Sequence, residues 1–215
     1  MCSRCPAGSI PRERALMLIL ERLRPNWRWL HIHESSPVVR GVSLLLAHEC
    51  PKYVPIQFFP GVPGGAMYRG FRCEDIEAQT FDNGSFDLVI TEDVMEHVLH
   101  PDRAYREIYR ALRSGGLHLH TVPIYSEMEK TETCAVLAED GGIIHLSTPP
   151  EYHGNPIDES GALVTPRYGR DLPDMISEWA PFSVEVTDLT TGVDFGAFGP
   201  VEVEQLRRPA PITSD

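Results

Sequence analysis

The sequence predicts a single α/β domain with a doubly wound, mostly parallel sheet, helices on both faces and an antiparallel last strand. Two observations carry this prediction. Short hydrophobic segments of strand length alternate along most of the chain with segments whose apolar residues recur at helical spacing. The last two strand-like segments, 183–190 and 201–208, follow each other without a helix, which is typical of an antiparallel pair.

The first half of the chain supplies two helices and four strands. A helix is expected from Arg12 to Arg24, because Pro11 suits a first turn and Pro25 stops the helix. A second helix-like segment spans 37–50. Strands are expected at 27–34, 52–59, 71–77 and 86–92. The last of these, "FDLVITE", is hydrophobic enough to be buried on both faces of the sheet.

The second half adds a helix that opens at Pro101 and is expected to end at the Gly115–Gly116 pair, followed by a strand at 117–123. Residues 124–170 form an irregular stretch that is too long for a plain connection, so a lid or insert is expected there. A helix at 168–182 leads into the final strands. The predicted organisation is a flexible N-terminus at 1–10, one domain at 11–208 and a tail at 209–215.

Composition limits the partners that the protein can have. The net charge is −12 and no Lys/Arg-rich run occurs, which argues against nucleic acid as the main partner. No apolar stretch has the length of a membrane span and no secretory pattern opens the chain, so a cytoplasmic protein is expected. Cys2 and Cys5 have metal-ligand spacing without a second pair, so no metal site is expected there. The oligomeric state stays open.

Four ionisable side chains follow the fourth strand: Glu92, Asp93, Glu96 and His97. Strand ends in open α/β sheets are where ligands bind, so the cluster marks a candidate site. His97 could accept a proton from a substrate hydroxyl, because the unperturbed imidazole pKa lies near neutrality. The alternative is a structural Glu-His pair that pins the loop.

Residues 81–123, "FDNGSFDLVITEDVMEHVLHPDRAYREIYRALRSGGLHLHTVP", resemble class I S-adenosylmethionine-dependent methyltransferases. That family commonly has a Phe-Asp-Leu-Val strand, a Glu-His pair and a helix ending in Leu-x-x-Gly-Gly. The later stretch "PPEYHGNPIDESGALVTPRYGRDL" resembles a bacterial subgroup of its methyltransferase type 11-like members. The resemblance implies a Rossmann-like fold, S-adenosylmethionine as cofactor, and methyl transfer to a small-molecule or sugar acceptor, with oxygen as the favoured atom.

The chain departs from the family at the first loop. The usual Gly-x-Gly turn after the first strand is replaced by "LHIHESSP", and the acid that ends the second strand is replaced by "PIQFFPG", with Gln57 as the nearest polar group. The alternative reading is therefore a methyltransferase-shaped binding or scaffold protein that has lost cofactor affinity. A nicotinamide-dependent enzyme is disfavoured, because no Gly-x-Gly-x-x-Gly follows the first strand.

The resemblance assigns cofactor contacts to the ends of the first and third strands. Asp75 would accept the adenine amino group, with Cys73 and Glu74 forming the wall. Glu34, the only acid of the altered first loop, would hold the ribose or the sulfonium end, or would cap a helix instead. His33 alternates with His31 along the strand, so one of the two is expected to be only packed.

The remaining candidates lie after the fourth strand and in the irregular stretch. Thr91, Glu92 and Asp93 are expected near the point of methyl transfer. Tyr152 and His153, held by the turn chemistry of "YHGNP", are candidates for a general base or a substrate hydrogen bond. The alternative for them is a loop tied down by its own side chains.

Overall fold

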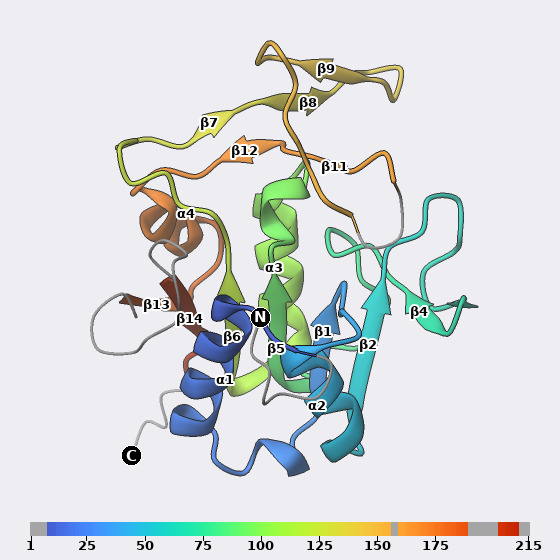
Figure 1. Ribbon diagram of the computed structural model, residues 1–215, viewed down its shortest axis with the longest axis vertical. Helices are drawn as coiled ribbons and strands as arrows, with labels where there is room; N and C mark the ends of the chain where they lie inside the picture. The colour runs from blue at the N-terminus through green and yellow to red at the C-terminus, as the bar shows by residue number, and fades with distance from the viewer. Residues whose placement is uncertain (1–7, 156–158, 189–201, 211–215) are drawn as a thin grey trace.

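The computed structural model describes residues 8–155, 159–188 and 202–210. Its centre is an eight-stranded sheet in the order β13-β14-β6-β5-β1-β2-β4-β3 (Figure 1). The strands are β1 (Ile32–Ser35), β2 (Tyr53–Gln57), β3 (Met67–Tyr68), β4 (Phe71–Cys73), β5 (Phe86–Glu92), β6 (Leu112–Thr121), β13 (Ser183–Asp188) and β14 (Glu202–Arg207).

The pairing of the strands confirms the predicted fold class. Strands β4, β2, β1, β5 and β6 run parallel, and β14 lies antiparallel between β6 and β13. The short β3 adds an antiparallel strand at the opposite edge, which the sequence pattern did not reveal. The polar ends of β1, β2, β4 and β5 therefore meet at one edge of the sheet.

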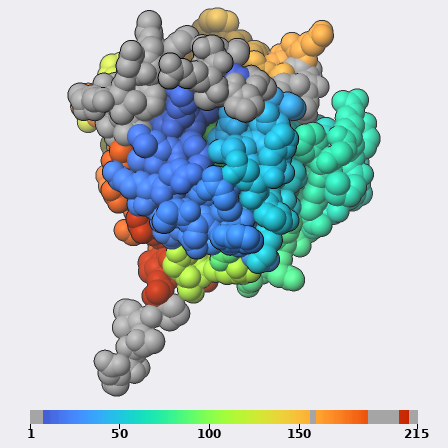
Figure 2. Space-filling model, turned by 60° about the horizontal axis from the view of Figure 1, so that its bottom comes forward, coloured from blue at the N-terminus to red at the C-terminus, as the bar shows by residue number. Residues whose placement is uncertain are grey.

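Two helices cover each face of the sheet. Helices α1 (Pro11–Leu23) and α2 (Gly41–Glu49) share one hydrophobic core, and α3 (Pro101–Ala111) and α4 (Leu172–Trp179) share the other. Figure 2 shows α1 and α2 side by side on one surface, in blue. Strand β5 serves both cores, because Leu88 and Ile90 face the first and Val89 faces the second, as the hydrophobic run predicted.

Several element boundaries differ from the prediction, three of them for a clear local reason. The expected strand at 27–34 is a 3₁₀ turn at Trp27–Trp29 followed by β1. Helix α2 begins at Gly41, whose φ of 52° favours glycine, instead of near Pro37. Helix α3 ends at Ala111, before the glycine pair, because the chain from Leu112 onward already pairs with β5 and the Gly115 N–H donates to the Arg208 carbonyl.

In the irregular stretch 124–170, the described residues form six short strands in three antiparallel pairs: β7 (Glu132–Thr133) with β12 (Pro166–Arg167), β8 (Ala135–Leu137) with β9 (Ile143–His145), and β10 (Tyr152–His153) with β11 (Ala162–Leu163). We call these strands the hairpin layer. Figure 1 shows them beyond the carboxyl ends of β1, β2 and β5. The expected helix at 168–182 is shorter and is α4.

Two hydroxyl groups anchor the hairpin layer to the turn η2 (Met95–His97), which follows β5. Thr165 donates its N–H to the Glu96 carbonyl at 2.8 Å and its hydroxyl to the Val98 carbonyl at 2.6 Å. The Tyr168 hydroxyl donates to the Met95 carbonyl at 3.0 Å. The layer is therefore bonded to the Glu-His loop that the sequence marked as a candidate site.

No helix among the described residues combines the length and the apolar character needed to cross a membrane. Cys2 and Cys5 lie outside the described residues, as do most of the predicted N-terminal segment and tail.

Candidate functional site

A pocket of about 500 Å³ lies at the carboxyl ends of β1, β2, β4 and β5, with the hairpin layer on its far side. This volume lies within the usual range for a small-molecule or cofactor site. Each strand end contributes residues to the wall, and the hairpin layer contributes the rest. The lining residues are Ser35, Ser36, Ile56, Gln57, Phe58, Pro60, Glu74, Asp75, Ile76, Glu77, Asp93, Val94, His97, Val98, Leu99, His100, Leu137, Gly154, Asn155 and Ala162.

The pocket is negatively charged. Four carboxylates line it, from Glu74, Asp75, Glu77 and Asp93, and its lining within the described part of the chain includes no lysine or arginine. Burial, and then the charge of Glu96, raise the pKa of Asp93 to about 6, although Arg12 forms an ion pair with Asp93 from outside the lining. Such a wall favours a ligand that carries positive charge.

The turn after β1 is made without the glycines that the family uses. Ser36 adopts a φ of 54° and its N–H donates to the Ile56 carbonyl at 2.9 Å. Asp93, at the end of β5, adopts a φ of 51°. Left-handed backbone at a residue other than glycine costs roughly 1–3 kcal/mol and concentrates at functional sites. Both strained residues line the pocket.

The acids after β4 differ in what their side chains do. The buried Glu74 carboxylate accepts hydrogen bonds from Arg72 Nε at 2.7 Å and from the Thr80 N–H at 2.8 Å. Asp75 Oδ1 accepts the N–H of Glu77 at 2.9 Å, which closes a turn. Glu74 therefore shapes the wall, whereas only one oxygen of Asp75 is taken up by the turn.

His97 lines the pocket with its ring orientation fixed. Its Nδ1 lies 2.9 Å from the Leu163 carbonyl of the hairpin layer. Because a carbonyl only accepts, Nδ1 carries the proton of the neutral ring. Nε2 of the neutral ring is therefore a base or a ligand atom.

Glu34 and His33, two of the predicted cofactor contacts, lie outside the lining of the pocket. Glu34 is buried on the α2 side, where its carboxylate accepts the hydroxyls of Ser43 at 2.6 Å and Tyr53 at 2.5 Å. Burial raises the pKa of Glu34 to about 7. His33 packs against the rings of Phe81 and Phe86, and burial lowers its pKa to about 3. Both are structural residues here.

Three more predicted contacts also point away from the pocket. The Cys73 thiol lies against main-chain carbonyls 3.5 and 3.7 Å away. Thr91 Oγ1 lies 3.0 Å from His118 Nε2 inside the sheet. Glu92 is enclosed on the same side as Glu34, and burial, together with the Glu34 charge, raises its pKa well above the usual value. Asp93, which follows β5 with a φ of 51°, lines the pocket, whereas Glu92 does not.

Tyr152 and His153, the two candidates in the hairpin layer, differ in their position relative to the pocket. Tyr152 is 53% exposed and is not part of the pocket wall. His153 is also outside the lining, but it precedes the lining residues Gly154 and Asn155 and lies 3.8 Å from Glu96. Of the predicted set, the structure thus gathers Gln57, Glu74, Asp75, Asp93 and His97 around the pocket.

Several lining residues were not singled out in the sequence. Ser36 has no signal of its own, since its importance lies in a backbone angle. Glu77 follows Asp75 in the run "CEDIE", and its carboxylate accepts the His100 N–H at 2.9 Å, which joins the ends of two loops. Leu137 and Asn155 reach the wall only through the fold of the hairpin layer.

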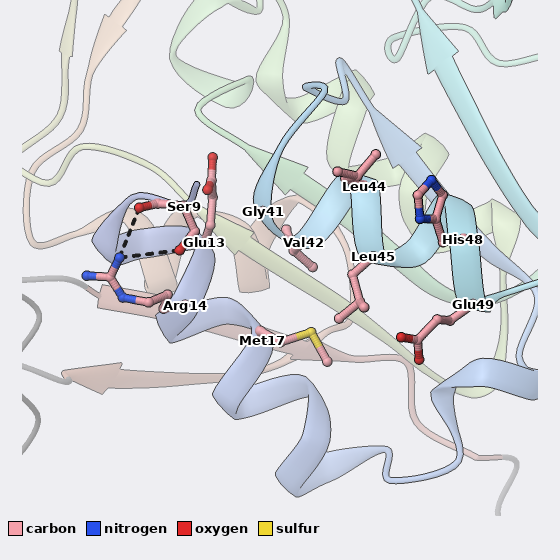
Figure 3. A pocket seen from close by; sticks show the side chains of 10 residues that line it. All are labelled: Ser9, Glu13, Arg14, Met17, Gly41, Val42, Leu44, Leu45, His48 and Glu49. Carbon is pink, nitrogen blue, oxygen red and sulfur yellow. Dashed lines mark hydrogen bonds between the residues drawn. The ribbon is translucent and has the colours of Figure 1, made fainter. Parts of the chain in front are cut away.

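A second, smaller cavity of about 250 Å³ lies between α1 and α2 (Figure 3). Met17 from α1 and Leu45 from α2 project into it from its two sides. Its polar groups are engaged at the rim, where Arg14 donates to the Ser9 carbonyl at 3.0 Å. It lies away from the carboxyl ends of the strands, so the larger pocket is the candidate active site.

Comparison with known proteins gives one family match. Residues 62–120 match the Methyltransferase domain family, over less than half of the chain. The matched segment includes β4, β5 and the loops that follow them. Comparison of the sequence with curated proteins gives no match.

Solved structures of low sequence identity share the fold. An S-adenosylmethionine-dependent methyltransferase from Mesorhizobium loti is 15% identical, with a TM-score of 0.58 over 94% of this chain and 99% of that chain. Burkholderia thailandensis 1,6-didemethyltoxoflavin-N1-methyltransferase, with bound 1,6-didemethyltoxoflavin and S-adenosylhomocysteine, is 9% identical, with a TM-score of 0.55 over 92% and 78%. The [4+2]-cyclase SpnF is 13% identical, with a TM-score of 0.56 over 93% and 81%.

At these identities the likeness establishes the fold alone. The family match covers the ends of β4 and β5 but not those of β1 and β2, and the shared fold covers nearly the whole chain. The matched segment is therefore similar to the Methyltransferase domain family, and nearly the whole chain has the fold of the S-adenosylmethionine-dependent methyltransferase from Mesorhizobium loti.

Proposed function

We propose that the chain transfers the methyl group of S-adenosylmethionine, bound in the pocket at the ends of β1, β2, β4 and β5, to a hydroxyl oxygen of a small-molecule or sugar-type acceptor. The observation that carries the proposal is the charge of this pocket: four carboxylates and no lysine or arginine line its described wall. The cofactor brings a sulfonium and an ammonium group, and negative surroundings attract both.

The wall offers a partner for each part of the cofactor. Asp75 and Ile76 after β4 suit the adenine, since the carboxylate accepts an amino group and the aliphatic side chain packs on a ring. Gln57 at the end of β2 suits the ribose hydroxyls in place of an acid. Ser36 after β1 suits the amino-acid end, and Asp93 after β5 suits the sulfonium.

The reaction in this pocket is an in-line displacement. The acceptor oxygen forms a bond to the methyl carbon, the carbon–sulfur bond breaks with its electron pair going to sulfur, and S-adenosylhomocysteine leaves as a neutral thioether. The proton of the acceptor hydroxyl passes to Nε2 of His97, whose Nδ1–H is held by the Leu163 carbonyl. Holding the two reactants in line supplies several kcal/mol of the barrier reduction.

The hydroxyl is favoured over an amine because of the placement of this base. A neutral amine attacks without prior loss of a proton, whereas a hydroxyl needs a base during the attack. The Leu163 carbonyl leaves the neutral His97 with an unprotonated Nε2 in the wall. Leu137, Ala162 and Asn155 of the hairpin layer offer a mixed apolar and polar surface for a small acceptor.

Calorimetry with S-adenosylhomocysteine tests the proposal. Asp75→Asn keeps an oxygen for the Glu77 N–H but removes the charge, so we expect at least tenfold weaker binding; one charged hydrogen bond contributes about 1.5–3 kcal/mol. Asp82→Asn, on an exposed turn outside the lining, is the matched control and should bind normally. If the unmodified protein gives no heat at millimolar ligand, the binding or scaffold alternative replaces this proposal.

A further inference from the structure

Three side chains with metal-ligand chemistry converge beside the pocket: Glu96 and His97 from the turn η2, and His153 from β10. One ligand atom of each lies within 4.8 Å of the others. Glu96 Oε1 is 3.8 Å from His97 Nε2 and 3.8 Å from His153 Nδ1. The turn and the hairpin layer are far apart in the sequence, and the Thr165 hydrogen bonds to the turn hold them together.

Both imidazoles are oriented by an acceptor on the nitrogen that faces away from Glu96. His97 Nδ1 lies 2.9 Å from the Leu163 carbonyl, and His153 Nε2 lies 3.2 Å from Glu151 Oε1. Arg167 in turn donates to Glu151 Oε2 at 2.9 Å. Metal-binding histidines are typically held in this way, with the second nitrogen donating to a carbonyl or a carboxylate.

The Glu96 carboxylate is buried without a hydrogen-bond donor among the described residues, and it faces the imidazoles of His97 and His153 at 3.8 Å. Glu96 is 2% exposed, and neither of its side-chain oxygens accepts a hydrogen bond from the described residues. An ionised carboxylate in such a position is costly unless a cation compensates it. The two histidines that face it present nitrogen atoms that can bind a cation.

We propose that Glu96, His97 and His153 hold a divalent transition-metal ion at the edge of the pocket. One carboxylate and two imidazoles form a three-ligand set that Zn²⁺ and Fe²⁺ take in proteins, with further positions left open. Ligand atoms about 2.1 Å from a tetrahedral metal lie about 3.4 Å apart. The two pairs that include Glu96, at 3.8 Å, need small side-chain adjustments, and the two histidine nitrogens, which lie within 4.8 Å of each other, need a larger one.

The position of the cluster suggests a use for the open coordination positions. His97 lines the pocket, and His153 is followed by the lining residues Gly154 and Asn155. An acceptor oxygen on the metal would be fixed beside the methyl donor, and the metal would lower the pKa of that hydroxyl. With the ion bound, His97 Nε2 would be a ligand and no longer the base; the metal-bound hydroxyl would lose its proton to water, and its oxygen would then attack the methyl group. This use rests on the proposed function, whereas the binding of the ion does not.

Titration of the chelator-treated full-length protein with Co²⁺ and Zn²⁺ tests the site. The protein carries no histidine tag, and both Cys2 and Cys5 are replaced by serine, so that this thiol pair cannot bind the probe. We expect one Co²⁺ per chain with visible absorption bands, displaced by Zn²⁺, and a rise in melting temperature with Zn²⁺. Glu96→Gln should weaken Co²⁺ binding at least a hundredfold and abolish that rise.

Two further variants sharpen the test. His153→Gln alters a partly exposed residue and should lose Co²⁺ binding even if Glu96→Gln folds poorly. His145→Asn, on the exposed strand β9, is the control and should bind Co²⁺ normally. Absence of Co²⁺ binding, or binding by the Glu96 and His153 variants as tight as that of the protein with both residues intact, would overturn the proposal and leave a proton on His153 as the balancing charge. Because the titration uses no cofactor, its failure is distinguishable from failure to bind S-adenosylhomocysteine.

Discussion

Glu34 gives the sharpest test of how the first strand is built, through the variant Glu34→Gln. Its carboxylate is enclosed, with the Ser43 and Tyr53 hydroxyls as its hydrogen-bond partners. Burial raises its pKa from 4.5 to about 7. The folded state therefore binds this proton more tightly than the unfolded state, and the stabilisation is complete below about pH 4.5 and is lost as the pH rises through 7.

The magnitude follows from the two pKa values. Between pH 5 and pH 8 the contribution of Glu34 to the free energy of unfolding falls by about 2 kcal/mol, at about 1.4 kcal/mol for each pH unit in which the two states differ by a full proton. Glutamine has no such dependence. We therefore expect the stability of the wild type relative to Glu34→Gln to fall by this amount over the same pH range.

Urea unfolding of both proteins at pH 5, 6, 7 and 8 measures the difference between their free energies of unfolding. The contributions of most other titrating groups are the same in both proteins and cancel in this difference. A difference that stays constant with pH would refute the buried, protonated Glu34. The same variant should bind S-adenosylhomocysteine within threefold of the wild type. A tenfold loss would instead mean that Glu34 reaches the cofactor, as the sequence alone had suggested.

Two further predictions concern the pocket turn and the hairpin layer. Ser36→Gly should raise the free energy of unfolding, measured in urea, by up to about 1 kcal/mol. Glycine removes the strain of the left-handed backbone, but its greater conformational freedom in the unfolded state offsets part of this gain. A lower free energy of unfolding would contradict the strained turn. Thr165→Val removes the hydroxyl donated to Val98 and should cost about 1–3 kcal/mol. Hydrogen exchange should then speed up in β7–β12 but not in β5, and equal exchange in both proteins would show that this anchor does not hold the layer.

The sheet could be predicted from the sequence because strands such as β5 have a recognisable hydrophobic pattern. Four of its residues, Phe86, Leu88, Val89 and Ile90, are hydrophobic and buried, and turn residues precede the run. The location of the pocket follows from the same pattern, since parallel strands end at a common edge. Asp75, Asp93 and His97 could be expected there for this reason.

Other features depend on contacts between distant residues and could not be predicted in this way. From the sequence alone Glu34 is a plausible cofactor ligand, but in the fold its carboxylate accepts a hydrogen bond from the Tyr53 hydroxyl. The two- and three-residue strands of the hairpin layer are too short to give a periodic pattern. The end of α3 is set by the pairing of Leu112 with Phe86, so the glycine pair that signalled a helix end falls inside β6.

The central claim is that the negatively charged pocket at the strand ends is the cofactor site. A crystal structure of the protein soaked with S-adenosylhomocysteine tests it most directly. We predict the adenine amino group within hydrogen-bond distance of the Asp75 carboxylate, the ribose beside Gln57 and the sulfur near Asp93. Density for the ligand in the cavity between α1 and α2, or a pocket that stays empty at millimolar S-adenosylhomocysteine, would contradict the account.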